Sequence, residues 1–469
     1  MKMSKGVYVI FQLDTEDYIT PQADDVLLDL VKIFNKHGIK GSFAIVGEKA
    51  RVLERRGRRD VIEALRTQDI AYQSNHHSLH PTIAEYLKDL GWEEGVKEVI
   101  KRESKGIEDL KRIFGQLPSA FIQPGGSWAP QVPYVMRTLG IRVYADGIFL
   151  PQPMWFCGIL AVRYSLSFHE KESGTPEHLQ MLKRKFDEIY NALKESGGIV
   201  IIVLHPCMLL TKEFWDAINF ARGAMPDELK PAPLVQRSLY ERRLVEFEEF
   251  VSYIVKHPKV KVITFRELPD LYEEERIKLD LKDMEVLAEK IAEVPSFYMV
   301  NGKSVSLAEA FYALTYALKT YNERGTLPKE IAPPPLLGPL RMPPSLKKRL
   351  KVKSEIVLAL AKSVYHELME RKVIPSEIRI GDDAIGPLSF LYVMAQAFLM
   401  ILRGEKHEEL EIVSLNEELS FKDYDVRKRV AGQWSWIIFP EGFRSEKIME
   451  LTLLQLWTLK PAVMKDLND

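Results

Sequence analysis

Three histidines lie within five residues of one another, in the segment Ser-Asn-His-His-Ser-Leu-His-Pro at residues 74–81. His76 and His80 are four residues apart, so one helical turn would place both imidazoles on the same side of a metal ion. The alternative interpretation is a polar loop whose histidines face water.

A second group of chemically useful side chains follows a short apolar segment near the N-terminus. Asp14, Glu16 and Asp17 come directly after the apolar residues 7–11. Clustered carboxylates raise one another's pKa unless a cation joins them, so the group predicts a cation site. The alternative is a helix cap or a solvated turn.

Three further segments place polar or glycine-rich residues after apolar runs. His205 follows the apolar residues 199–204, Asp146 follows 143–145, and Gln123-Pro124-Gly125 follows 120–122. Active sites of α/β proteins lie at the carboxyl ends of parallel strands, where such residues converge. Together these strand ends indicate an active site more strongly than any one of them.

The elements that must position these residues alternate between short apolar runs and amphipathic helices. Apolar runs predict buried strands at 7–11, 42–46, 70–72, 120–122, 143–145, 159–162, 199–204 and 260–265. Helical patterns separate several of them, including 24–38, 92–114 and 178–195. Repeated β-α units with buried strands predict parallel pairing in a barrel or a doubly wound sheet.

The pattern becomes mainly helical after residue 275, which predicts domains at 1–275 and 276–469. Ser306 and Glu309 form a capping-box pattern at the start of one helix. Residues 323–331 resemble residues 370–378 at an offset of about 47 residues, and each copy follows an amphipathic helix. We expect these helices to pack on each other or on the first domain, or to form a homo-oligomer interface.

Composition excludes several classes of function. The chain has 469 residues, with 65 Lys and Arg against 66 Asp and Glu, so no overall positive charge favours nucleic acid or an anionic membrane. No apolar run reaches the length of a membrane span, and no signal segment is apparent. The two cysteines fit a reducing compartment, and we expect a cytoplasmic protein.

Taken in order, the polar segments resemble the motifs of the polysaccharide deacetylase family, also called carbohydrate esterase family four, over roughly residues 5–275. The resemblance implies a distorted (β/α)7-type barrel and a divalent metal, usually zinc, held by one carboxylate and two histidines. It makes Asp14 the catalytic base, Glu16 or Asp17 the metal carboxylate, and His76 and His80 the remaining ligands. His77 then replaces a hydroxyl residue of the motif.

The remaining motifs imply acid catalysis and substrate contacts. Leu204-His205-Pro206 resembles the family's last motif, which makes His205 the general acid, and Asp146 either holds it protonated or is a turn residue. Gln123 stands where the family has an arginine that steadies the base. Gln123, Pro124, Gly125 and Trp128 are the predicted substrate-binding residues.

The predicted function is metal-dependent hydrolysis of a C–N amide bond, with removal of acetyl from an N-acetylated sugar or oligosaccharide as the leading reaction. One alternative is a cyclic imide or ureide hydrolase, because metal-free allantoinases share this fold. Another is a weakly active carbohydrate-binding protein whose helical repeats recognise a polymer. Gln123 favours the alternatives, whereas the paired histidines favour the first.

Overall fold

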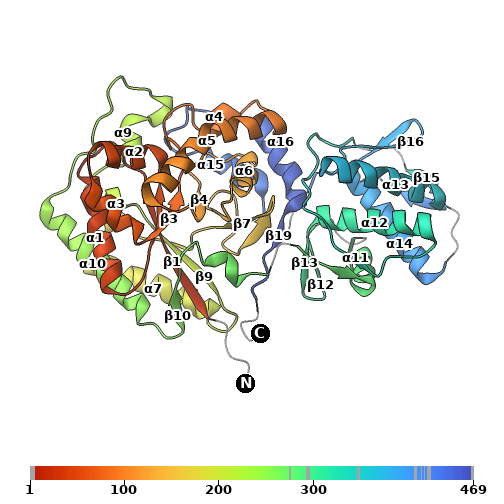
Figure 1. Cartoon of the computed structure of the whole chain (residues 1–469), viewed down its shortest axis with the longest axis horizontal. Helices are drawn as coiled ribbons and strands as arrows, with labels where there is room; N and C mark the ends of the chain where they lie inside the picture. Colours follow the sequence, from red (N-terminus) through yellow and green to blue (C-terminus); the bar gives the residue numbers. More distant parts are fainter. Residues whose placement is uncertain are drawn as a thin grey trace.

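The structure is a computed structural model that describes residues 6–273, 276–291, 296–344, 346, 349–405, 409–413, 415–416, 418–419 and 424–465. A larger α/β part and a smaller, mainly helical part lie side by side (Figure 1). Within the described residues, no helix is both long and apolar enough to cross a membrane.

One curled sheet forms the centre of the larger part. Its strands lie in the order β19-β6-β7-β5-β4-β3-β2-β1-β9-β8, and β10 pairs with the start of β1. All these pairings are parallel except those of β6 with β7 and with β19. The strands are β1 (Val7–Thr15), β2 (Ser42–Ile45), β3 (Asp69–Tyr72), β4 (Ala120–Ile122), β5 (Val143–Ala145), β6 (Met154–Phe156), β7 (Ile159–Val162), β8 (Leu166–Ser167), β9 (Gly198–Leu204), β10 (Val260–Val262) and β19 (Lys460–Pro461).

Helices connect successive strands and pack on the outer side of the sheet. They are α1 (Ala23–Lys36), α2 (Gly47–Arg55), α3 (Arg59–Arg66), α4 (Ile83–Leu87), α5 (Trp92–Phe114), α6 (Gln131–Thr138), α7 (Pro176–Leu193), α8 (Pro206–Leu210), α9 (Trp215–Asn219) and α10 (Arg237–Val255), with 3-10 turns η1 (Glu170–Glu172), η2 (Ala221–Gly223) and η3 (Leu268–Leu271). The α/β barrel-type fold expected from the sequence is therefore confirmed, as are the strand and helix positions within a few residues. The short strands β6, β8 and β19 were not predicted.

Strand alternation divides the sheet into two buried faces. Along β1, Val7, Val9, Phe11 and Leu13 belong to the core beneath the helices, whereas Tyr8 and Ile10 belong to a separate inner cluster. Much of that inner cluster is alanine or β-branched, which lets the sheet curl tightly. The even-numbered side chains after Ile10 therefore continue toward the mouth of the barrel.

The smaller part contains two helix–hairpin–helix units. The first consists of α11 (Leu281–Ile291), β12 (Tyr298–Val300), β13 (Lys303–Val305) and α12 (Leu307–Arg324), and the second of α13 (Ser354–Arg371), β16 (Ile378–Ile380), β17 (Asp383–Ile385) and α14 (Pro387–Arg403). Two further strand pairs accompany them: β11 (Leu279–Asp280) with β14 (Glu330–Ile331), and β15 (Leu350–Lys353) with β18 (Glu409–Ile412).

The predicted repeat lies at the ends of two neighbouring helices. The predicted capping box is present, with Ser306 and Glu309 bonded reciprocally at the start of α12. Residues 323–331 follow α12, and residues 370–378 follow α13, and these two helices contact each other. The copies differ in their strand pairing, because β14 pairs with β11 and β16 forms a hairpin with β17.

The last described residues return to the barrel part. They form α15 (Val426–Gln433), α16 (Glu446–Gln455), η4 (Leu456–Thr458) and β19, and they appear in blue in Figure 1. β19 extends the central sheet by pairing with β6, and the Ala462 N–H donates to the Pro153 carbonyl at 3.0 Å. A boundary at residue 275, which itself lies outside the described residues, therefore does not separate residues 424–465 from the barrel.

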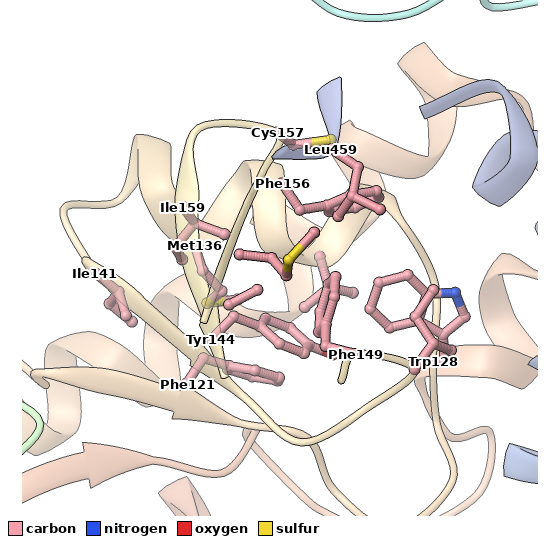
Figure 2. Close-up of a cluster of buried hydrophobic side chains, with 14 of the residues drawn as sticks. Phe121, Trp128, Met136, Ile141, Tyr144, Phe149, Phe156, Cys157, Ile159 and Leu459 are labelled. Carbon is pink, nitrogen blue, oxygen red and sulfur yellow. The ribbon is translucent and has the colours of Figure 1, made fainter. Parts of the chain in front are cut away.

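Trp128 belongs to the core that this return completes. It is fully buried among Tyr144, Phe149 and Phe156, as Figure 2 shows. Its indole Nε1–H donates to the Thr452 hydroxyl of α16 at 2.9 Å. The structure thus places Trp128 in packing rather than at a substrate-facing surface.

Candidate active site

A cavity of about 250 Å³ lies at the carboxyl ends of the strands. The mouth contains side chains at or directly after the ends of β1, β3, β4, β5, β7, β8 and β9, together with residues from the C-terminal return. The lining residues are Asp14, Glu16, Gln73, His77, Gln123, Gly125, Gly126, Asp146, Gly147, Arg163, Tyr164, Ser167, Val203, His205, Phe214, Gly432, Gln433, Ser435 and Trp436.

Asp14 and His205 face each other across the ends of neighbouring strands β1 and β9. His205 Nε2 lies 3.8 Å from Asp14 Oδ2, which is too long for a hydrogen bond but leaves both groups within reach of a bound ligand. Burial raises the pKa of Asp14 to about 7, although the positive charge of His205 opposes the shift. Asp14 therefore changes its charge close to neutral pH.

Glu170 holds the other side of the His205 ring. Its Oε1 lies 3.2 Å from His205 Nδ1 and accepts the His205 backbone N–H at 2.6 Å. Burial disfavours the imidazolium, but Glu170, Glu16 and Asp14 outweigh burial and raise the pKa of His205 to about 10. The same contact lowers the pKa of Glu170 despite its burial.

Glu170 was not predicted from the sequence. It lies on the 3-10 turn η1, 35 residues before His205 and just after the short strand β8, which was not predicted. Asp146 was expected to hold His205 protonated, but its hydrogen bonds go elsewhere: Oδ2 accepts from Gln12 at 2.9 Å and Oδ1 from the Tyr164 backbone N–H at 3.3 Å. Burial raises the pKa of Asp146.

Gln12 makes the contact with Asp14 that the motif predicts for residue 123. The Gln12 Nε2 donates to Asp14 at 3.0 Å and to Asp146 at 2.9 Å, so it links the two carboxyl groups. Gln123 instead donates to Gln433 Oε1 at 2.7 Å and accepts from the Tyr144 hydroxyl at 3.0 Å. Pro124 does not line the cavity, whereas Gly125 does.

The predicted metal ligands are not brought together. Ser74 and His77 have positive φ angles of 65° and 54°, so residues 74–81 form an irregular turn rather than a helical one. His76 is exposed, and both ring nitrogens of His80 have partners, Glu85 at 2.6 Å and the Phe220 carbonyl at 3.1 Å. Among the described residues, no group of three or more His, Cys, Asp or Glu side chains is arranged to hold a metal ion.

The sequence did not decide whether Glu16 or Asp17 is the metal carboxylate, and the structure gives these two side chains different surroundings. Glu16 lines the cavity, on the same strand face as Asp14, and its Oε2 lies 2.7 Å from His77 Nε2. Asp17 points away from it, because its Oδ1 accepts the backbone N–H groups of Ile19 and Thr20, each at 2.9 Å. The predicted set of His76, His80 and one of these carboxylates thus does not fit a divalent metal as folded.

His77 begins a buried polar chain that ends at the C-terminal return. Its Nδ1 lies 2.6 Å from the Ser78 hydroxyl, which donates to Asp216 at 3.1 Å. Asp216 also accepts from Trp436 Nε1 at 3.2 Å. Burial opposes a charge on His77, but Glu16 and Asp216 outweigh burial and raise the pKa of His77, which favours its charged form beside Glu16.

The C-terminal return forms one wall of the cavity. Gln433 contacts Gln123, and the Trp436 side chain is 41% exposed beside the cavity. A Cβ atom on Gly126 would lie 1.7 Å from the Gln433 carbonyl oxygen, so only glycine allows this close approach. Sequence reasoning missed these contacts because they join residues about 310 positions apart.

No family model and no curated protein matches the chain. Solved structures that are similar include a Mycobacterium smegmatis protein assigned to the polysaccharide deacetylases, with 15% identity, 58% of this chain and 91% of that chain covered, and a TM-score of 0.37. A Pseudomonas aeruginosa protein with the same assignment has 14% identity, coverage of 56% and 90%, and a TM-score of 0.40.

A family 4 carbohydrate esterase from Streptomyces lividans is also similar, with 11% identity, coverage of 55% and 93%, and a TM-score of 0.31. These structures carry the family name that the sequence motifs predict. The likeness is partial, so the roles of individual residues rest on the geometry of this chain.

Proposed function

We propose that this chain is a hydrolase of C–N amide bonds that removes an acyl group, such as acetyl, from an N-acylated molecule the size of a sugar. One observation carries the proposal: Asp14 and His205 face each other at the strand ends and line a cavity of about 250 Å³, and Glu170 contacts the far side of the His205 ring. A positioned general base and a positioned general acid each accelerate hydrolysis of an amide, by activating water and by protonating the leaving nitrogen.

Asp14 is the proposed general base. With a pKa of about 7, it is ionised above neutral pH and retains enough basicity to take a proton from water. That water adds its oxygen to the amide carbonyl carbon and forms a tetrahedral intermediate. Gln12 holds the Asp14 carboxylate in position through its 3.0 Å hydrogen bond.

His205 is the proposed general acid. It enters the reaction as an imidazolium, because its pKa lies near 10. When the intermediate collapses, the C–N bond breaks and the leaving nitrogen takes the proton of His205 Nε2. Glu170 positions the ring from Nδ1 and stabilises its charge, so it acts as a positioning residue.

The metal dependence predicted from the sequence is not part of this proposal. The predicted ligands do not fit a divalent ion in the arrangement described, so the proposed roles belong to side chains of the chain itself. Zinc binding stays a prediction to be measured.

The test is product analysis with purified full-length protein. We expect free acetate from an N-acetylated amino sugar, and Asp14→Asn should lower the rate by a factor of about 10²–10⁴. Asp89→Asn, at a carboxylate that is 81% exposed, is the matched control and should retain the wild-type rate. Equal rates for Asp14→Asn and wild type would contradict the role of Asp14.

Hydrolysis of a cyclic imide or ureide is the second candidate, and the amide side chains of the cavity favour it. Gln73, Gln123 and Gln433 all line the cavity, and Gln73 Oε1 is buried without a hydrogen-bond partner among the described residues. Such groups complement the alternating N–H and C=O groups of these rings. Ring opening without release of acetate would establish this candidate in place of the first.

A further inference from the structure

A second hollow adjoins the catalytic cavity, and most of the charged side chains that line it are cationic. It has a volume of about 490 Å³ and shares Gly147, Arg163, Gly432 and Gln433 with the catalytic cavity. Its other lining residues are Asp425, Lys428 and Arg429, from the start of α15. We call this hollow the outer lobe. It lies between the end of β7 and the C-terminal return.

Three cationic side chains meet in the outer lobe. Arg163 follows β7, whereas Lys428 and Arg429 belong to α15, so the cluster forms only when the return segment packs on the barrel. In the part of the chain that the structure describes, no carboxylate lies within 4.0 Å of their charged nitrogens. Their charge therefore stays available to a ligand.

Uncharged groups hold the Arg429 side chain in place without neutralising it. The Arg429 guanidinium lies 5.1 Å above the Tyr424 ring and donates to the Phe149 carbonyl at 3.4 Å. Among the described residues that line the outer lobe, Asp425 is the one acidic residue, and its Oδ1 caps α15 by accepting the Lys428 backbone N–H at 2.9 Å. Three positive charges thus face one negative charge that already has a helix-capping role.

The catalytic cavity has charged groups of both signs. Asp14, Glu16 and Asp146 line it together with His77, His205 and Arg163, so its carboxyl groups already have cationic neighbours. In the outer lobe the cationic side chains outnumber the carboxylate, so a ligand that spans both hollows is accommodated best with a neutral group beside Asp14 and an anionic group among Arg163, Lys428 and Arg429. This separation of charge would orient the ligand before any chemistry occurs.

We infer that the substrate carries a phosphate group, which binds in the outer lobe to Arg163, Lys428 and Arg429 while the acylated nitrogen lies beside Asp14. This inference rests on the proposed function and specifies its substrate class: a phosphorylated N-acyl amine, such as an N-acetylamino sugar phosphate. Two guanidinium groups and one ammonium group suit the oxygens of a phosphate, because guanidinium groups bind them in pairs.

The experiment is calorimetric measurement of binding to the full-length protein, which does not depend on turnover. The probes are N-acetylglucosamine 1-phosphate, N-acetylglucosamine and N-acetylmuramic acid, which carries a carboxylate. We expect the phosphorylated sugar to bind at least about tenfold more tightly than the neutral sugar, and added salt should reduce the difference.

Variants locate the contact. Lys428→Glu should abolish the preference for the phosphorylated sugar, whereas Lys101→Glu, at a lysine that is 76% exposed on α5, should retain it. Equal affinity for the neutral and phosphorylated sugars, or a preference unaffected by Lys428→Glu, would overturn the inference. Equally tight binding of the carboxylated sugar would also overturn the choice of phosphate.

This outcome is separable from that of the proposed function. Tight binding of the phosphorylated sugar without release of acetate would support the outer lobe and contradict deacetylation. Release of acetate from both sugars, with equal affinities, would support deacetylation and contradict the outer lobe.

Discussion

At the scale of single residues, the neighbour that raises the pKa of His205 most is Glu170, which no motif indicates. Glu170 is buried, and it contacts both the ring and the backbone N–H of His205. Because a raised histidine pKa keeps the acid protonated, kcat/KM should be bell-shaped, with an acid limb near 7 from Asp14 and an alkaline limb near 10 from His205.

Glu170→Gln should move the alkaline limb to lower pH. Removal of the carboxylate charge lowers the pKa of His205, so the acid loses its proton earlier as the pH rises. The glutamine carbonyl can still accept the His205 backbone N–H, which preserves the fold. The measurement is kcat/KM against pH, and an unmoved alkaline limb in a folded variant would show that Glu170 does not set the charge of His205.

Gln12 and Gln123 provide a matched pair for the acid limb. The hydrogen bond from Gln12 lowers the pKa of both Asp14 and Asp146, whereas Gln123 contacts neither carboxyl group. Gln12→Leu should therefore move the acid limb to higher pH, and Gln123→Leu should leave it in place. A shift of the acid limb in Gln123→Leu but not in Gln12→Leu would contradict this assignment. It would show that Gln123 positions the Asp14 carboxylate, as the motif implies for residue 123.

Metal binding is tested by zinc content in three histidine variants. His80 has protein partners at both nitrogens and His76 is exposed, so we expect His76→Ala and His80→Ala to have the zinc content of the wild type. His77→Ala removes the side chain that contacts Glu16, and its zinc content is compared with that of the other two variants. Loss of one equivalent of zinc in either His76→Ala or His80→Ala would show that the loop rearranges to bind metal.

At the scale of elements, much of the barrel could be predicted from the sequence, because each buried strand is a short apolar run followed by a polar strand end. This pattern located Asp14, Asp146 and His205 at one edge of the sheet. The sequence did not identify His77 as the histidine of residues 74–81 that lines the cavity. Its orientation depends on the positive φ angles of Ser74 and His77, which the sequence pattern does not reveal. Gln433 and Trp436 could not be predicted either, because their segment does not follow a predicted strand.

The contact between Gly126 and the C-terminal return is the element-scale test. In Gly126→Ala, the new methyl group would overlap the Gln433 carbonyl, and the return segment would have to move. We expect a loss of about 1–3 kcal/mol in the free energy of unfolding and a raised KM. The control is Gly6→Ala, whose new Cβ atom would meet only Tyr8 side-chain atoms at 3.7 Å, and an unchanged melting temperature in Gly126→Ala would contradict the close approach.

At the scale of the whole molecule, the chain crosses from the barrel to the helical part and back. The return brings three kinds of contact: strand pairing of β19 with β6, hydrogen bonds to Trp128 and Cys157, and the Gln433–Gln123 contact in the cavity. Lys460 of β19 also pairs with Glu309 of α12 at 2.6 Å, with both side chains largely buried. The two parts are therefore joined by packing as well as by sequence.

A fragment ending at residue 275 should consequently aggregate. It keeps the apolar residues around Trp128 but loses α16 and β19, which cover them, so a contiguous apolar surface becomes exposed.

A second variant, with residues 1–273 joined to 424–469 by a flexible linker, restores that cover and the cavity wall. It should be more soluble than the 1–275 fragment, yet less stable than the full chain, because Trp457 loses its contact with Phe311 of α12. Size-exclusion chromatography and thermal unfolding measure both expectations. A soluble, monomeric 1–275 fragment with full activity would show that the return segment is dispensable and that the helical part is an independent module.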